Sequence, residues 1–245
     1  MAILENAVQV LRCFTVNRGE LTLTEVSQLL AMPKSNVSRL LRAMREQGLL
    51  DSAPDSKAYR PGILLLELGQ IAHAGQGLLS AASIAVRAIC DAMGHTGYVS
   101  ARYGNQIAGL VHHSGQNLLK VGVPLGVRLP VHACATGRSI LALQTDEQVR
   151  AQLGDQLERP NPHAPANIKE LLERLARVRE TGYAESTQEA DRGVDALAVA
   201  VKDPNTAEAL SLCITFPQAT VDAYERRKLI DLLLQAQTDV TRNRK

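Results

Sequence analysis

The chain has 245 residues, of which 45% are hydrophobic and 21% charged, so it is long enough for two modest domains and too apolar to remain disordered. No apolar run approaches the length of a membrane span, and the four cysteines are too far apart in sequence for a disulfide framework or a structural zinc site. The amino terminus lacks the basic stretch of a secretion signal, so we expect a cytoplasmic protein without a metal or another cofactor.

Basic residues gather in one short segment of this near-neutral chain. The net charge is only +2, but residues 33–46 hold four basic residues against one acidic residue, Glu46. A local basic surface indicates a polyanion partner, whereas a solvated helix face is the ordinary alternative that charge alone leaves open. The basic residues are Lys34, Arg39, Arg42 and Arg45.

Two helices are predicted before this segment. The first runs from residue 4 to residue 16 and turns five apolar residues inward at helical spacing: Leu4, Ala7, Val8, Leu11 and Phe14. The second begins with a capping box at Thr22 and Glu25, in which each side chain accepts a hydrogen bond from the backbone amide of the other residue. Its inward residues are Val26, Leu29 and Leu30.

The basic segment is predicted to be a third helix that starts at Pro33 and ends before Gly48. Its buried face carries Val37, Leu40, Leu41 and Met44. Two short strands, residues 49–51 and 58–60, follow around a polar turn, and this order is typical of a winged helix-turn-helix. Hydroxyls and guanidiniums suit base edges and phosphates, so we expect eight residues to contact DNA: Lys34, Ser35, Asn36, Ser38, Arg39, Arg42, Lys57 and Arg60.

Four blocks of the sequence resemble the isocitrate lyase regulator (IclR) family of bacterial transcription factors. They read "LTEVSQLLAMPKSNVSRLLRAMREQGLL", "YRPGILLLELG", "LPVHACATGRSILA" and "GYAESTQEADRGVDALAVAVKD", in the family's order. The resemblance implies a homodimer or homotetramer, a pseudo-palindromic double-stranded DNA operator, and repression as the commoner mode. Ala31 stands where the family usually has Gly in a turn, and we expect ordinary backbone angles there.

The rest of the chain predicts a linker helix and an α+β domain. The apolar stretch between Gly62 and Gly75 predicts a helix that packs either on a partner subunit or within its own chain. Helices are then expected over 78–93, 137–144, 146–153, 167–181 and 221–240, with strand pairs around Gly104 and Pro204. Together these elements indicate an antiparallel sheet, and the resembled family's second domain is similar to the GAF and PAS folds. The predicted domains are residues 1–61, a winged helix-turn-helix; 62–76, a linker helix; and 77–245, an effector-binding domain.

The segment "HACATGRSILA" places small residues before a predicted helix, where free backbone amides attract carboxylates or phosphates. In the resembled family, the residues matching Ala135 and Thr136 give backbone amides to an effector, and four further positions line its pocket. The resemblance therefore implies six effector-binding residues: Ala135, Thr136, Ser186, Ala196, Cys213 and Thr215. Ser186, Ala196 and Phe216 depart from members that bind small keto-acids. We expect a small organic acid, and the sequence leaves its identity open.

An enzymatic function is the alternative that Cys134 and His132 suggest. A thiol near a helix start has a lowered pKa, but no third group that would orient the pair can be named, so we expect no enzyme. His112 and His113 are adjacent in a predicted strand and point to opposite faces, which argues against a shared metal ion. The rival function is a small-molecule-binding or catalytic module whose winged helix contacts another protein.

Overall fold

The computed structural model describes residues 3–15, 18–54, 56–74, 77–117, 126–206 and 208–242. The chain divides into two compact units, Met1–Gln76 and Gly77–Lys245. Each unit combines helices with an antiparallel sheet, so the α+β class predicted from the sequence is confirmed. The division of the first unit into a winged helix and a linker helix stays a prediction.

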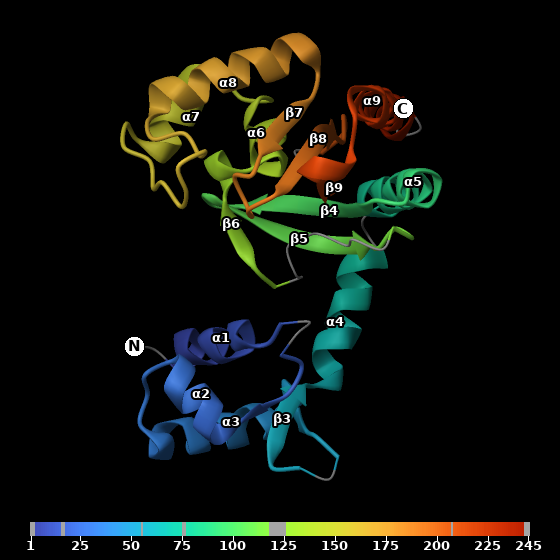
Figure 1. Cartoon of the computed structure of the whole chain (residues 1–245). Coiled ribbons are helices and arrows are strands. Elements are labelled where there is room, and N and C mark those ends of the chain that lie inside the picture. Colours follow the sequence, from blue (N-terminus) through green and yellow to red (C-terminus); the bar gives the residue numbers. More distant parts are fainter. Residues whose placement is uncertain are drawn as a thin grey trace. The chain divides into compact units, whose positions relative to one another are not determined.

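The N-terminal unit is a helix cluster with a small sheet beside it (Figure 1). The sheet has three strands in the order β1-β3-β2. Its apolar core joins residues of three helices and two strands. Its elements are α1 (Ile3–Cys13), β1 (Leu21–Thr22), α2 (Leu23–Leu29), α3 (Lys34–Glu46), β2 (Leu50–Ser52), β3 (Ala58–Pro61) and α4 (Ile63–Ala74). The predicted order of three helices followed by a hairpin is confirmed, and the two-residue strand β1 is an addition to it.

Local signals set the ends of α2 and α3. The capping box is present: the Thr22 amide donates to Glu25 Oε2 at 2.7 Å, and the Glu25 amide donates to Thr22 Oγ1 at 3.3 Å. After α3, Gly48 has a φ of 73° and donates to the Arg45 carbonyl, while Leu49 donates to the Met44 carbonyl. These two bonds form a Schellman motif, and the helix end that the sequence predicted before Gly48 is confirmed.

The turn between α2 and α3 corrects one expectation. Ala31 has a φ of 52° and is therefore in the left-handed region, not at ordinary backbone angles. The reason is again a Schellman motif: Ala31 donates to the Gln28 carbonyl at 3.3 Å and Met32 donates to the Ser27 carbonyl at 3.1 Å. The geometry of this motif requires a positive φ at its turning residue, so an L-residue here carries conformational strain.

The buried faces of α1 and α2 differ partly from those predicted. Helix α1 buries Ala7, Val10 and Cys13, and Phe14 directly after it is buried too, whereas Leu4 is 75% exposed and Val8 is also exposed. In α2, Val26 is buried but Leu29 is 46% exposed. Helical spacing shows that a helix has an apolar face, but α1 is apolar on two sides, and only packing decides which side is buried. The predicted stripe of α3 is confirmed, with Leu40 half-buried and the rest buried.

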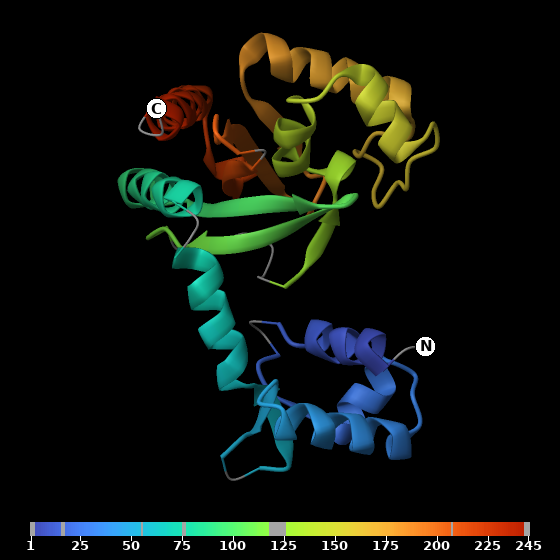
Figure 2. The same ribbon diagram turned by 180° about the vertical axis from the view of Figure 1, so that it is seen from behind.

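The C-terminal unit is a six-stranded antiparallel sheet with helices on both faces (Figure 2). The strand order is β6-β5-β4-β9-β8-β7. Its elements are α5 (Gly77–Met93), β4 (Thr96–Tyr103), β5 (Gln106–His113), β6 (Arg128–Pro130), α6 (Ala135–Leu141), α7 (Asp146–Leu153), α8 (Ile168–Thr181), β7 (Ala184–Thr187), β8 (Val194–Lys202), β9 (Ala209–Pro217) and α9 (Ala223–Arg242). The predicted helices and both strand pairs are confirmed. Strand β7 was not predicted, and residues 118–125, between β5 and β6, lie outside the described residues.

Alternation along β8 explains how the two faces of this sheet differ. Leu197, Val199 and Val201 pack with α5 and α9 in the main core. The residues between them are alanines, Ala196, Ala198 and Ala200, and they face α6. Because these side chains are small, α6 can lie close to the sheet, and part of the space between the sheet and the start of α6 stays unfilled.

Candidate functional site

The exposed face of α3 presents the residues that were predicted to contact DNA. Lys34, Ser35, Asn36, Arg39 and Arg42 are exposed, and Ser38 is half-buried. Arg39 Nη2 donates to Asn36 Oδ1 at 3.0 Å, which orders the guanidinium on the surface. Since Val37 and Leu41 are fully buried on the opposite side, the polar face cannot turn inward without breaking the core. This face can therefore offer hydrogen bonds to base edges and phosphates.

The β2–β3 hairpin carries the two other predicted DNA contacts. Lys57 and Arg60 are both exposed, and Arg60 lies opposite Asp51 across the strand pair. Asp55, part of the predicted turn, lies outside the described residues. Exposed cations on a hairpin next to a recognition helix suit contacts to the DNA backbone.

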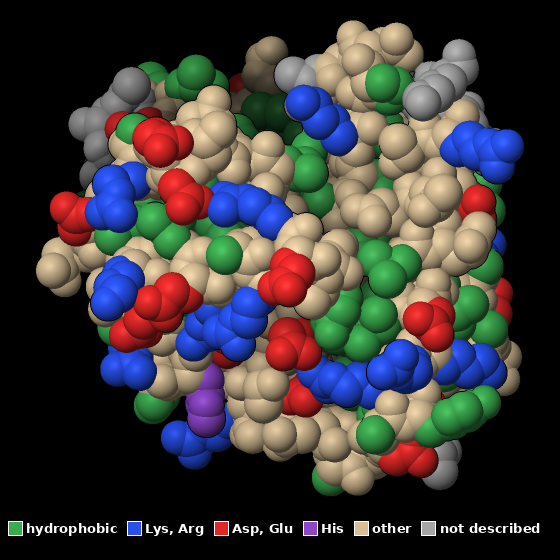
Figure 3. Space-filling view, turned by 90° about the horizontal axis from the view of Figure 1, so that it is seen from above, with side chains coloured by type: hydrophobic (Ala, Val, Ile, Leu, Met, Phe, Trp, Pro, Cys, Tyr) green, Lys and Arg blue, Asp and Glu red, His purple; other side chains and the backbone are tan. Residues whose placement is uncertain are grey.

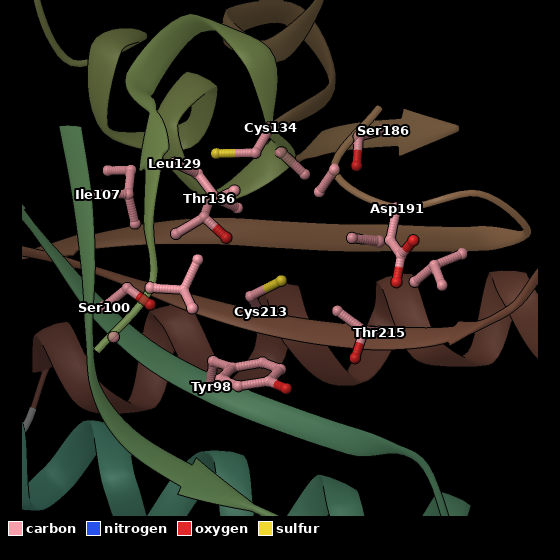
Figure 4. A pocket seen from close by; sticks show the side chains of 16 residues that line it. Tyr98, Ser100, Ile107, Leu129, Cys134, Thr136, Ser186, Asp191, Cys213 and Thr215 are labelled. Atoms are coloured by element: carbon pink, nitrogen blue, oxygen red, sulfur yellow. The ribbon is translucent and has the colours of Figure 1, made fainter. Parts of the chain in front are cut away.

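The six residues predicted to bind an effector all line one cavity of the C-terminal unit (Figure 4). It lies on the α6 face of the sheet and is bounded by β4–β9, the start of α6, and residues 190–191. Its volume, measured as the space open to the centre of a water molecule, is about 60 Å³. A single water needs about 10–15 Å³ by that measure, so the cavity has room for a small molecule.

Strand register explains how residues far apart in sequence come together here. Ser186 on β7 pairs with Ala196 on β8, and Ala196 pairs with Thr215 on β9, so the three form one row across the sheet. In the next row, Cys213 pairs with Tyr98 of β4. Side chains of the same row point to the same face of a sheet, which is why these residues share a wall of the cavity.

Hydroxyl groups supply most of the polarity in the cavity. Thr215 donates to the Thr96 carbonyl at 3.3 Å, and the Thr136 hydroxyl opposes part of the rise that burial causes in the pKa of the Cys213 thiol. The hydroxyls of Tyr98, Ser100 and Ser186 have no hydrogen-bond partner within the described part of the chain. Burial raises the pKa of the Tyr98 hydroxyl, so it stays protonated and can donate. Sequence reasoning missed Tyr98 and Ser100, because nothing in their local sequence marks them.

Cys134 has a structural role that argues against a nucleophile. It is the N-cap of α6, where its sulfur accepts a hydrogen bond from the Gly137 amide at 3.3 Å. Burial raises the pKa of the thiol to about 11, so the thiolate is scarce at neutral pH. His132 Nε2 lies 2.6 Å from the Glu158 carbonyl oxygen instead of pairing with the thiol.

A buried ion pair holds two walls of the cavity together. Arg138 on α6 contacts Glu189 with both terminal nitrogens, at 2.5 and 2.8 Å, and the two side chains are 1% and 5% exposed. Arg138 also donates to the carbonyls of His132 and Glu185, and Arg174 donates to Glu189 at 2.9 Å. Arg138 follows Thr136 by two residues, and Glu189 precedes Ala190 in the cavity wall. No local sequence pattern could have paired residues 51 positions apart.

Elsewhere on the C-terminal unit, charges of both signs are interspersed. Figure 3 shows Lys and Arg side chains beside Asp and Glu on the face that carries α8 and α9. Two ion pairs of this region are Arg179 with Asp146 and Arg226 with Glu185. Such a mixed surface offers less attraction to a polyanion than α3 does.

The described residues contain neither a helix that could span a membrane nor a cluster of metal ligands. No helix there combines the length and the apolar character that crossing a bilayer requires. Within the same ranges, no three His, Cys, Asp or Glu side chains converge as metal ligands would. The adjacent histidines have separate neighbours: His113 lies 3.0 Å from Ser83 Oγ, and the His112 ring packs beside Tyr98.

Comparison with known proteins gives a consistent result for both units. The model of the IclR helix-turn-helix domain matches residues 3–54, and the model of the bacterial transcriptional regulator IclR C-terminal domain matches residues 71–242. The chain is 28% identical over 233 residues to the HTH-type transcriptional regulator XynR of Escherichia coli, covering 95% of this chain and 92% of XynR.

Solved structures agree with these matches. The crystal structure of a putative IclR transcriptional regulator from Silicibacter sp. is 26% identical, with a TM-score of 0.79 and coverage of 99% of this chain and 96% of that one. An IclR homolog of Microbacterium hydrocarbonoxydans, complexed with 4-hydroxybenzoate, has the same fold at 21% identity, with a TM-score of 0.82 and coverage of 99% and 98%. The chain belongs to the IclR family: it is a transcriptional regulator and not an enzyme, with a DNA-binding helix-turn-helix domain and a C-terminal effector-binding domain.

Proposed function

We propose that this regulator binds a pseudo-palindromic DNA operator through α3, supported by Lys57 and Arg60 of the hairpin, and that it acts in the cytoplasm as a repressor. The observation that carries the proposal is the two-sided character of α3. Val37 and Leu41 anchor the helix in the core, while Arg39 and Arg42 on its other side are exposed. A recognition helix needs this combination to enter the major groove.

The proposed assembly is a homodimer or a homotetramer. Four large apolar residues of α4 are more than half exposed: Ile63, Leu66, Leu68 and Ile71. Several exposed apolar side chains on one helix favour a partner subunit over burial within the same chain. A two-fold dimer also accounts for two half-sites in one operator. Sedimentation equilibrium tests this assembly, and a monomer at micromolar concentration would contradict it.

The proposed effector is a small organic acid held in the cavity of the C-terminal unit. The convergence of all six expected residues on one cavity supports this proposal. An effector acts by its different affinity for arrangements of the dimer that fit or do not fit the half-site spacing. The complex of the Microbacterium homolog suggests 4-hydroxybenzoate as a first compound to try.

A gel-shift assay against genomic fragments tests DNA binding directly. We expect preferred fragments at moderate salt, whereas the absence of any preference would favour a winged helix that contacts protein. Arg39→Ala should cost about 1–3 kcal/mol on the preferred fragment and little on other DNA. Lys57→Ala should weaken all sequences alike and flatten the salt dependence. Arg227→Ala, an exposed position on α9, is the control for the loss of one charge.

A further inference from the structure

A second hollow of the C-terminal unit lies where α8 passes beside β7, and it shares no lining residue with the cavity proposed for the effector. Its volume, by the same measure, is about 370 Å³, which gives room for a small organic molecule. Three of its lining residues are arginines and two are glutamates, and we refer to it as the arginine cleft. These residues are Arg138, Arg174, Arg177, Glu185 and Glu189.

Both carboxylates of the arginine cleft are already bonded. Glu189 is shared by two guanidiniums, because Arg138 contacts it with two nitrogens and Arg174 contacts it with one. Glu185 accepts a hydrogen bond at 2.8 Å from Arg226, which does not line the cleft. Since Arg226 compensates Glu185, the three guanidiniums of the cleft face one remaining carboxylate, and positive charge is in excess there.

Arg174 and Arg177 also have hydrogen-bond donors to spare. A guanidinium carries five N–H groups. Arg174 uses one of them on Glu189 and one on the His163 carbonyl oxygen, which lies 3.0 Å away. The Arg177 side chain makes no hydrogen bond or ion pair with the part of the chain that the structure describes. These free donors are available to a ligand in the cleft.

The two arginines lie close together and repel each other. They are three residues apart on α8, a spacing that makes side chains neighbours on one helix face. Burial lowers the pKa of Arg174, and the like charges of Arg138 and Arg177 lower it further. Glu173 and Glu180, one helical turn to either side of Arg177, do not line the cleft and form no ion pair with it among the described residues. An anion that contacts both guanidiniums would therefore relieve an uncompensated repulsion.

A phosphate group suits this set of donors. Guanidinium forks pair with phosphate oxygens through two parallel hydrogen bonds, and a phosphate monoester presents three terminal oxygens and a charge of about −1.5 to −2. Arg174 and Arg177 can therefore donate to different oxygens of one phosphate. On the β7 side, Thr187 offers a hydroxyl and Glu185 a carboxylate, which suit hydroxyl groups on the organic part of the ester.

We infer that the arginine cleft is a second ligand site, which binds a small phosphate monoester through Arg174 and Arg177. The inference goes beyond the proposed function, because this ligand is neither the operator nor the effector of the cavity. Glu189 competes with the phosphate for Arg174 and repels it, so this carboxylate limits the affinity.

Calorimetric titration of the full chain with glycerol 3-phosphate tests the inference, with glycerol as the neutral counterpart and the ionic strength held constant. Wild type should bind one glycerol 3-phosphate per chain and give no saturable heat with glycerol. Arg177→Gln should weaken binding at least about tenfold, whereas Arg177→Lys, which keeps the charge but not the fork, should weaken it less. Glu189→Gln should tighten binding at least about threefold, a gain that damage to the fold would not produce.

Arg227→Gln is the matched control, because it removes an exposed arginine of α9 that does not line the cleft, and it should leave the affinity within about twofold. Equal weakening by Arg227→Gln and Arg177→Gln would indicate general attraction to positive charge and overturn the inference. No saturable binding at millimolar glycerol 3-phosphate would overturn it too. So would an affinity that falls with Arg39→Ala but not with Arg177→Gln, because the phosphate would then be bound at α3. Unfolding curves of each variant separate lost binding from lost structure.

Discussion

The buried pair of Arg138 and Glu189 makes a quantitative prediction about the C-terminal unit. Glu189→Gln keeps the size of the side chain but removes the charge that compensates a guanidinium only 1% exposed. Breaking a buried pair in this way costs about 3–5 kcal/mol. Arg138 keeps two carbonyl acceptors, those of His132 and Glu185, so we expect a loss of about 3 kcal/mol, at the lower end of that range.

Urea unfolding followed by circular dichroism measures this loss, and dichroism is the suitable signal because the chain has no Trp. The control is Asp155→Asn, which breaks the ion pair with Arg150 in which the side chains are 53% and 74% exposed. That change should cost below about 1 kcal/mol.

The double variant Arg138→Met with Glu189→Met should cost less than the sum of its two single changes, because no unpaired charge remains buried. A loss below about 1 kcal/mol for Glu189→Gln, equal to that of the surface control, would refute the reasoning. Such a result would mean that the pair of Arg138 and Glu189 stabilises the fold no more than a solvent-exposed ion pair does.

Three further predictions concern two single substitutions and the buried cysteines. Ala31→Gly should stabilise the N-terminal unit by about 0.5–1 kcal/mol, because glycine adopts the positive φ of this position without strain. Ala43→Gly, at an exposed position of α3, should destabilise the unit by about 1 kcal/mol. Thermal unfolding compares the two variants, and a loss of stability for both would contradict the strain at Ala31. Gly137→Ala should lower the free energy of unfolding by at least about 2 kcal/mol, because its Cβ would overlap the Val131 carbonyl oxygen. Gly104→Ala, which has open space around it but a φ of 60°, should lower it by about 1 kcal/mol in the same urea assay. Equal losses for the two variants would argue against the close packing of α6. Burial raises the pKa of Cys90 and Cys134 to about 11 and that of Cys213 to about 12. A thiol reagent at pH 8 should therefore label these three cysteines only after the protein unfolds. Rapid labelling of Cys134 in the native protein would support the hypothesis that this thiol is a nucleophile.

Local chemistry determined much of this protein from the sequence alone. The capping box at Thr22, the Schellman glycine at position 48 and the apolar stripe of α3 act within one or two helical turns, so their effects could be predicted without the fold. The strand pair around Gly104 depends on a similarly short-range turn signal. The resemblance to the IclR family added the expected effector residues, which neither spacing nor composition could supply.

Only the tertiary structure decided which of several apolar sides is buried and which distant residues meet. Leu4 and Leu29 fit a helical stripe yet are exposed, because burial depends on what packs against each helix. Ala31 adopts a left-handed conformation because two backbone hydrogen bonds outweigh its intrinsic preference. The row of Ser186, Ala196 and Thr215 and the pairing of Arg138 with Glu189 depend on strand register and on contacts between distant segments, and these interactions exist only once the chain has folded.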